Sequence, residues 1–180
     1  MAYALLELAL GALFALAYAK VGLTIALAPL LLALFILAVI IVYDIRHTIV
    51  PPVLSFLLFV ASLAYAYLSS AGMAAFGLAL MVAGIIAAFF FLLHVGSGGR
   101  AMGLGDAPIA LSVSLIAAGN ALAGLLFSFW IGALYGVLIL VLRRGGPKMG
   151  IEVPFVPFLA AGFLLAYFTG WNPLFSVLAL

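Results

Sequence analysis

The sequence lacks cysteine and has few charged residues, and each shortage excludes a class of function. Without cysteine, the chain has no disulfide bond, no thiolate ligand for zinc and no cysteine nucleophile. Charged residues make up 6% of the chain, against about 25% in an average soluble domain. Its six Lys and Arg residues never form a dense cluster with interleaved aromatic residues, so we expect no nucleic acid among its partners.

Long apolar runs take the place of the missing charge. Hydrophobic residues make up 71% of the chain, and the mean hydropathy is +1.55. The runs are continuous, whereas the strands of a membrane barrel would alternate apolar and polar residues. The composition therefore predicts an all-α fold, a polytopic helical bundle surrounded by membrane lipid. No polar stretch is long enough for an aqueous domain, so residues 1–180 are expected to form a single transmembrane domain.

The apolar runs predict about seven transmembrane helices, separated by short polar or glycine-rich turns. As one helix, the run from 107 to 142 would measure roughly 54 Å, against a hydrocarbon core of about 30 Å. This run must therefore form two helices, and the break is predicted at Gly119-Asn120. The predicted helices span residues 3–19, 24–43, 53–68, 73–94, 106–118, 121–142 and 153–170.

The basic residues predict how the bundle is oriented. If the first of seven spans starts in the cytoplasm, five of the six basic residues fall on cytoplasmic loops and only Lys20 falls outside. These five are Arg46, Arg100, Arg143, Arg144 and Lys148. We therefore expect a cytoplasmic N-terminus. The same topology places Asp44 and Asp106 on the cytoplasmic side, at similar depth.

These two isolated aspartates are the strongest candidates for chemistry. Asp44 ends an apolar run ahead of Pro51-Pro52, and Asp106 follows the segment 96–105, where five glycines are expected to leave the backbone mobile. An ionisable group beside the bilayer core is a functional-site hypothesis. Two carboxylates close together in a low-dielectric site cannot both ionise readily, so one can act as a general acid and the other as a general base. The alternative is that Asp106 merely caps a helix and Asp44 is hydrated beside Arg46.

Other polar residues give weaker signals. His47 and His94 lack a third ligand at helical spacing, and the glycine-rich segment follows a membrane helix instead of a strand, so we expect neither a metal nor another cofactor. Ser128 lacks the sequence context of a serine nucleophile. Glu7 is expected either to pair with a polar group inside the bundle, which we favour, or to assist at the site.

Four segments resemble, in order, those of the type IV prepilin peptidases and preflagellin peptidases, which are membrane aspartic proteases. Residues 100–106, Arg-Ala-Met-Gly-Leu-Gly-Asp, are similar to the family's Gly-x-Gly-Asp catalytic segment. Residues 44–51 are similar to the segment that carries its first aspartate, and residues 153–160 to its Ile-Pro-Phe-Gly-Pro-Phe-Leu-Ala segment. Residues 3–16 look like its first helix. Together these matches span nearly the whole chain.

The resemblance implies an activity and a set of site residues. It implies an aspartic endopeptidase in the plasma membrane of a prokaryote, with its active site facing the cytoplasm, that removes the leader peptide from prepilin-like or preflagellin-like precursors. Asp44 and Asp106 would be catalytic. The residues that would bind substrate or support the loop are Arg46, Arg100, Gly103, Gly105, Pro154 and Pro157.

The chain departs from the family pattern in two places. Pro108 stands where the family has a lysine, two residues after the second aspartate; this removes a positive charge but suits the first turn of a helix. The zinc-binding Cys-x-x-Cys domain of many bacterial members, associated with N-methylation, is absent. The chain therefore resembles a minimal, peptidase-only form.

Two rival functions share the same aspartates. Tyr43-Asp44 with Gly103-Leu104-Gly105-Asp106 also fits the presenilin and signal-peptide-peptidase proteases, which place their aspartates within helices, whereas Asp44 is expected at a polar turn. A proton-coupled transporter could use the two carboxylates as a relay. Such a transporter should show an internal repeat with paired broken helices, and the sequence shows none.

Overall fold

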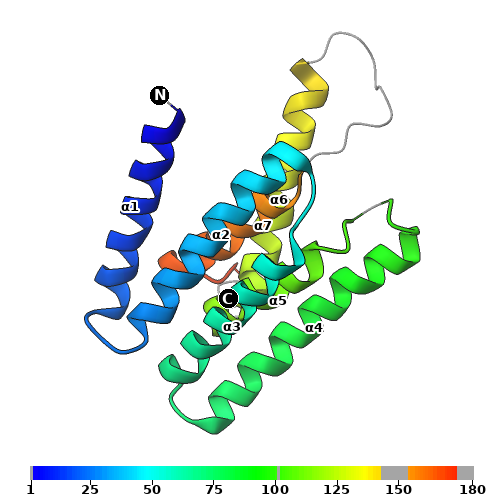
Figure 1. The fold of residues 1–180 in the computed structure, drawn as a ribbon. Coiled ribbons are helices and arrows are strands. Elements are labelled where there is room, and N and C mark those ends of the chain that lie inside the picture. Colours follow the sequence, from blue (N-terminus) through cyan, green and yellow to red (C-terminus); the bar gives the residue numbers. More distant parts are fainter. Residues whose placement is uncertain (1, 101, 143–153, 174–180) are drawn as a thin grey trace.

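The computed structural model describes residues 2–100, 102–142 and 154–173, which form helices and turns with no β-strand (Figure 1). The predicted all-α fold is confirmed, and each predicted helix has a counterpart close to its expected position. The elements are α1 (Ala2–Val21), α2 (Leu27–His47), α3 (Pro52–Ser69), α4 (Met73–Ser97), α5 (Asp106–Ala117), the 3-10 turn η1 (Ala118–Asn120), α6 (Ala121–Leu142) and α7 (Val156–Thr169).

The end of α2 differs from the prediction in a way that matters for function. Asp44 was expected in a polar turn, but α2 continues to His47, so Asp44 lies within its last turn. The helix ends only at Thr48, whose φ of 51° is left-handed and whose N–H donates to the carbonyl of Asp44. Pro51 disfavours helical geometry only for the residue before it, so it does not prevent α2 from continuing past Asp44.

The long apolar stretch after Asp106 forms two helices, as predicted. Ala118 has φ 47° and ψ −117°, a conformation that cannot continue a helix, and η1 follows. The chain then reverses direction. Near its start α6 approaches α7 at Phe163, and eight residues later Gly132 faces Phe155 and Phe158 at the other end of α7. Because α5 has only 12 residues, it measures about 18 Å and is too short to cross a bilayer core alone.

Small residues bring α6 and α7 into close contact. A Cβ atom on Gly124 would lie 2.7 Å from Cδ1 of Phe163, and one on Gly162 would overlap Ser128. The Ser128 hydroxyl lies 2.7 Å from the carbonyl of Gly124 and 3.1 Å from that of Leu159, so it hydrogen-bonds within the interface. Such close backbone approach is typical of membrane helices. Ser128 therefore has a structural role that its sequence context did not reveal.

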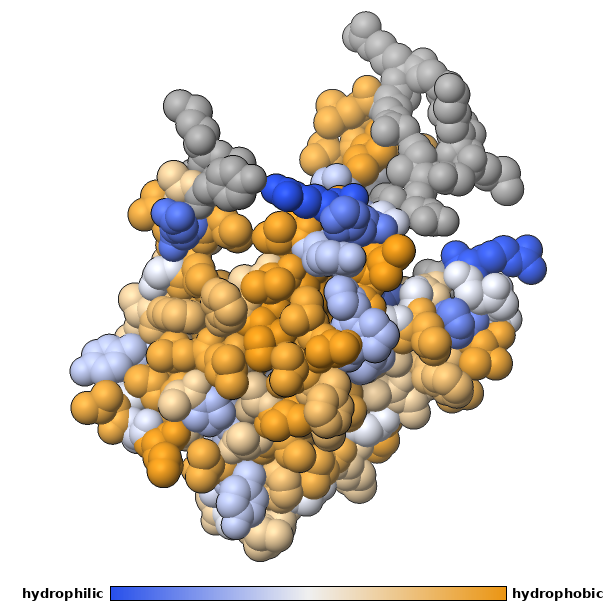
Figure 2. Space-filling model, viewed as in Figure 1, coloured by the Kyte–Doolittle hydropathy of each residue, from blue (hydrophilic) through white to orange (hydrophobic). Residues whose placement is uncertain are grey.

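The surface of the bundle is that of a multi-pass membrane protein. In the part of the chain that the structure describes, four helical stretches are long and apolar enough to cross a membrane, namely α2, α3, α4 and Asp106–Leu142, and α7 is a shorter apolar helix. Large apolar side chains such as Phe35 and Ile85 are exposed. Figure 2 shows apolar residues over most of the visible face, with hydrophilic residues gathered near its upper edge, where α2 and α4 end. An apolar surface with a polar edge suits contact with lipid.

Helix α1 packs against the bundle through its second half, where Phe14 and Ala17 meet the core. Glu7 is exposed on the first half, so the expectation that it pairs with a polar group inside the bundle is wrong. At the other end of α1, the ammonium group of Lys20 lies 4.9 Å from the ring centre of Tyr167, a cation–π contact. Lys20 therefore marks the end of the bundle opposite to the start of α7.

Candidate active site

Asp106 begins α5 and folds its carboxylate back over the preceding turn. Its backbone N–H donates to the carbonyl of Gly103 at 3.2 Å, and the N–H of Gly103 donates to its Oδ2 atom at 3.0 Å. The side chain is only 6% exposed. The carboxylate thus bonds to the turn before the helix instead of capping the helix itself, for which no side-chain cap is present. The Gly-Leu-Gly-Asp turn thus positions this carboxylate through two hydrogen bonds between Gly103 and Asp106.

Gly105 is required by space, because a Cβ atom there would lie 2.7 Å from Cβ of Val50. Val50 belongs to the segment between α2 and α3, so this contact joins the two aspartate segments directly. Gly103 is less restricted, since its Cβ would lie 3.4 Å from Oδ2 of Asp106. Neither glycine has a positive φ; in this segment only Gly98 and Gly99 do. Gly105 is therefore needed for close packing against Val50, a role that differs from the backbone mobility expected from the sequence.

Asp44 is buried at the C-terminal turn of α2, where it is 4% exposed. A negative charge at a helix C-terminus is unfavourable by about 0.3–1 kcal/mol. This cost is opposed by α7, because its first residue, Val156, directs its backbone N–H at the Asp44 carboxylate. The Oδ2 atom of Asp44 is buried and has no hydrogen-bond partner among the described residues. A buried acceptor without a partner costs about 1–3 kcal/mol, which is typical of a functional group.

The fold brings the two aspartates together. Asp44 is close enough to interact electrostatically with Asp106 although 62 positions separate them in the sequence, and His94 interacts with Asp106 as well. No Lys or Arg of the described residues pairs with either carboxylate. Two buried carboxylates that interact without a neutralising cation cannot both be charged at low cost. The arrangement is suited to sharing one proton.

The remaining predicted site residues lie at different distances from this pair. Arg46 is exposed, because it is two helical positions from the inward-facing Asp44, and Arg100 is exposed beyond the end of α4. Neither joins the aspartates. Pro154 and Pro157 are half-buried at the start of α7, and Pro157 occupies the first helical turn, where its missing N–H does no harm. Pro157 follows directly after Val156, whose N–H points at the Asp44 carboxylate.

No role at the site was expected for His94 from the sequence, yet the structure places it there. Its Nδ1 atom lies 2.9 Å from the carbonyl of Met102, beside the turn that holds Asp106. Its closeness to the glycine-rich segment was the only signal available. His47, by contrast, is exposed, and its ring lies tilted against that of Tyr43, with ring centres 4.5 Å apart. Among the described residues no group of three His, Cys, Asp or Glu side chains could hold a metal ion.

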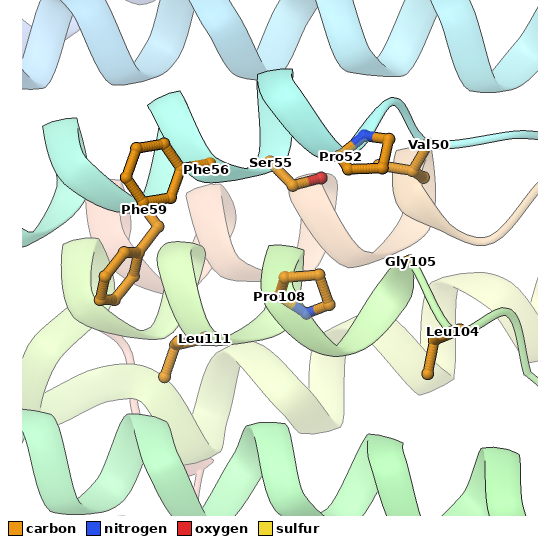
Figure 3. Close-up of a pocket in the computed structure, with 9 residues that line it drawn as sticks. All are labelled: Val50, Pro52, Ser55, Phe56, Phe59, Leu104, Gly105, Pro108 and Leu111. Atoms are coloured by element: carbon orange, nitrogen blue, oxygen red, sulfur yellow. The ribbon is translucent and has the colours of Figure 1, made fainter.

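An apolar groove of about 540 Å³ opens beside Asp106, between α3 and α5. Figure 3 shows residues of α3 facing residues of α5 across it. Ser55 is the only polar side chain among its lining residues, and its hydroxyl donates back to the carbonyl of Pro51. Pro108, which replaces the family's lysine, forms part of the wall. The lining residues are Val50, Pro52, Ser55, Phe56, Phe59, Leu104, Gly105, Pro108 and Leu111.

The position of Asp44 removes one argument against a rival function. The presenilin-like proteases were set apart because they place their aspartates within helices. In this structure Asp44 lies in α2 and Asp106 is the first residue of α5. The helical position of the aspartates therefore does not separate the two families, and other evidence must.

Comparison with known proteins supplies that evidence. Over 175 residues the chain is 30% identical to the prepilin leader peptidase/N-methyltransferase of Bacillus subtilis (strain 168). The aligned region covers 93% of this chain and 66% of that relative. No family model matches the sequence, and no solved structure matches it significantly.

Proposed function

Since the chain belongs to the prepilin peptidase family, we propose that it is an aspartic endopeptidase that removes the leader peptide from prepilin-like or preflagellin-like precursors. The observation that carries the proposal is the pair of buried carboxylates, Asp44 and Asp106, which interact with each other. An apolar groove is lined by Gly105, the residue before Asp106. The chain spans 66% of its curated relative, so its activity must be tested on the chain itself.

The proposed mechanism uses one carboxylate and one carboxylic acid. The ionised aspartate takes a proton from a water molecule as that water attacks the scissile carbonyl carbon. The protonated aspartate gives its proton to the reacting peptide, so that the C–N bond can break and the amine can leave. The dyad then holds one proton again. The buried Oδ2 of Asp44, which has no partner among the described residues, is an acceptor free to bind the water or the shared proton.

The groove between α3 and α5 would receive the apolar helix of the substrate. Its lining is apolar apart from Ser55 and includes Gly105, the residue before Asp106. A volume of about 540 Å³ suits a few large apolar side chains, not a whole helix. The substrate helix would therefore lie along the groove from the lipid side and insert side chains into it. Its leader would then extend past the two carboxylates.

We place the chain in the plasma membrane of a prokaryote with the dyad toward the cytoplasm. Arg46 lies in the last turn of α2 and Arg100 follows the end of α4, whereas Lys20 lies at the opposite end of the bundle. This bias agrees with the positive-inside rule. Arg143, Arg144 and Lys148, on which the orientation also depends, lie outside the described residues.

Co-expression with candidate precursors tests the activity and separates it from its rivals. We expect loss of the leader on a gel, and mass spectrometry of the product should place the cut just before the apolar helix of the substrate. A cut within that helix would favour a presenilin-like protease. No cleavage of any precursor, together with proton-coupled flux in proteoliposomes, would favour a transporter and contradict the proposal.

A further inference from the structure

The imidazole of His94 is held in one tautomer beside the proposed dyad. Its Nδ1 atom lies 2.9 Å from the carbonyl oxygen of Met102. A carbonyl oxygen only accepts hydrogen bonds, so Nδ1 must carry the proton and donate it. This holds for the neutral and for the charged ring, because both keep a proton on Nδ1 in that arrangement.

The peptide group that His94 contacts is the one that holds Asp106. The carbonyl of Met102 and the N–H of Gly103 belong to the same peptide bond, which is trans like every described peptide. They therefore lie in its plane and point in opposite directions. On the far side, the N–H of Gly103 donates to Oδ2 of Asp106 at 3.0 Å. Together the two hydrogen bonds make a continuous chain from the imidazole to the carboxylate.

The sequence builds this contact with two glycines in left-handed conformations. Helix α4 ends at Ser97, and Gly98 and Gly99 follow with φ values of 60° and 77°. The N–H of Gly99 donates to the carbonyl of His94 at 2.8 Å, which turns the chain back over the ring. A Cβ atom on Gly99 would lie 3.3 Å from Cε1 of His94. The turn therefore clamps the half-buried imidazole against the loop.

We propose that His94 is a positioning residue for the peptidase reaction: it orients and polarises the Met102–Gly103 peptide, so that the N–H of Gly103 holds the Asp106 carboxylate in its reactive position. A donor on one side of a peptide strengthens the hydrogen bond that the peptide makes on the other side. The inference rests on the proposed function for its kinetic effect, but its structural effect can be measured without any substrate.

Two substitutions separate donation by Nδ1 from mere packing. His94→Leu removes the donor, whereas His94→Asn places an amide N–H near the position of Nδ1. We expect His94→Leu to lower kcat about tenfold, the worth of one hydrogen bond in the transition state, with KM changed less than twofold. His94→Asn should recover most of kcat. His47→Leu, at the exposed histidine of α2, is the matched control and should leave kcat unchanged.

A nuclear magnetic resonance measurement tests the chain of hydrogen bonds from His94 through the Met102–Gly103 peptide to Asp106, independently of activity. Labelling methionine with carbonyl ¹³C and glycine with ¹⁵N selects the Met-Gly pairs, of which the sequence has two, at Met102 and Met149. Loss of one signal in Gly103→Ala assigns the other to Gly150. The amide proton of Gly103 should shift upfield in His94→Leu and return toward its wild-type position in His94→Asn.

Equal kcat in wild type and His94→Leu, or an equal loss in the Leu and Asn variants, would overturn the proposal. An unmoved Gly103 signal in His94→Leu would overturn it as well. If wild type cleaves no precursor while the Gly103 signal behaves as expected, the proposed function is wrong, but His94 still polarises the Met102–Gly103 peptide. If His94→Leu does not fold, comparison of His94→Asn with His94→Gln decides, because the amide of Gln reaches the position of Nε2 and should not restore the shift.

Discussion

Gly105→Ala is expected to damage catalysis through a contact between the two aspartate segments. The added Cβ would lie 2.7 Å from Cβ of Val50 and 3.0 Å from its Cγ2. To reach 3.4 Å, the short limit of ordinary contact, the two segments must separate by about 0.7 Å. Because Cβ of Val50 is fixed to its backbone, no rotamer change relieves this contact. The turn that carries Asp106 must therefore move relative to the segment after Asp44.

The expected loss of stability and of activity in Gly105→Ala follows from two effects. Overpacking of a buried contact destabilises a fold by about 1–3 kcal/mol. A displacement approaching 1 Å in a catalytic pair can lower the rate about a hundredfold. We therefore expect Gly105→Ala to lower kcat about ten- to a hundredfold and to lower the thermal midpoint in detergent by a few degrees. Activity is read as leader release from a purified precursor.

Matched variants test whether the contact between Gly105 and Val50 causes the loss of activity. Gly96→Ala should retain full activity, since a Cβ at Gly96 meets nothing within 4 Å. Val50→Ala in the Gly105→Ala background should not rescue activity, because the closest contact is with the Cβ that alanine keeps. Val50→Gly should rescue it in part. Wild-type activity in Gly105→Ala, or equal rescue by Val50→Ala and Val50→Gly, would refute the proposed contact.

Two further predictions test the groove and the helix interface. Leu111→Trp should fill part of the groove and raise KM several-fold with kcat nearly unchanged, because it blocks binding of the substrate's apolar helix without reaching the dyad; a raised KM for a leader peptide that lacks the helix would contradict this. Ser128→Ala should lower stability by about 1 kcal/mol, because the hydrogen bond to the carbonyl of Leu159 is lost, and should leave cleavage intact. Abolished cleavage in a folded Ser128→Ala variant would instead indicate a serine nucleophile.

The sequence was a good guide to the helices, because apolar length and glycine or proline breaks are local signals. Length required the run from 107 to 142 to divide, the Gly-Asn turn signal placed the break at Gly119-Asn120, and this position coincides with η1. The predicted end of α2 was wrong because Arg46 and His47 are polar and look like turn residues. A helix can expose both of them while it buries Asp44 on its other face. Polar character does not end a helix whose opposite side is still packed.

The pairing of the aspartates was anticipated from topology, but its supports were not. The contact of Gly105 with Val50, the N–H of Val156 and the carbonyl bound by His94 all depend on segments that are distant in sequence. Side-chain pattern gives no sign of where a backbone N–H or carbonyl will point. Such contacts follow only from the packed structure, and they are what turn two acidic residues into a candidate site.

The central claim is that Asp44 and Asp106 act together in peptide hydrolysis, and the most direct test is leader cleavage by purified single variants. Asp44→Asn and Asp106→Asn should each abolish cleavage, because an amide can neither share the proton nor activate water. Glu7→Gln, which removes an exposed carboxylate on α1, should cleave as wild type does. All three should still insert in the membrane and fold. Substantial cleavage by either aspartate variant, under conditions where wild type turns over, would contradict the dyad.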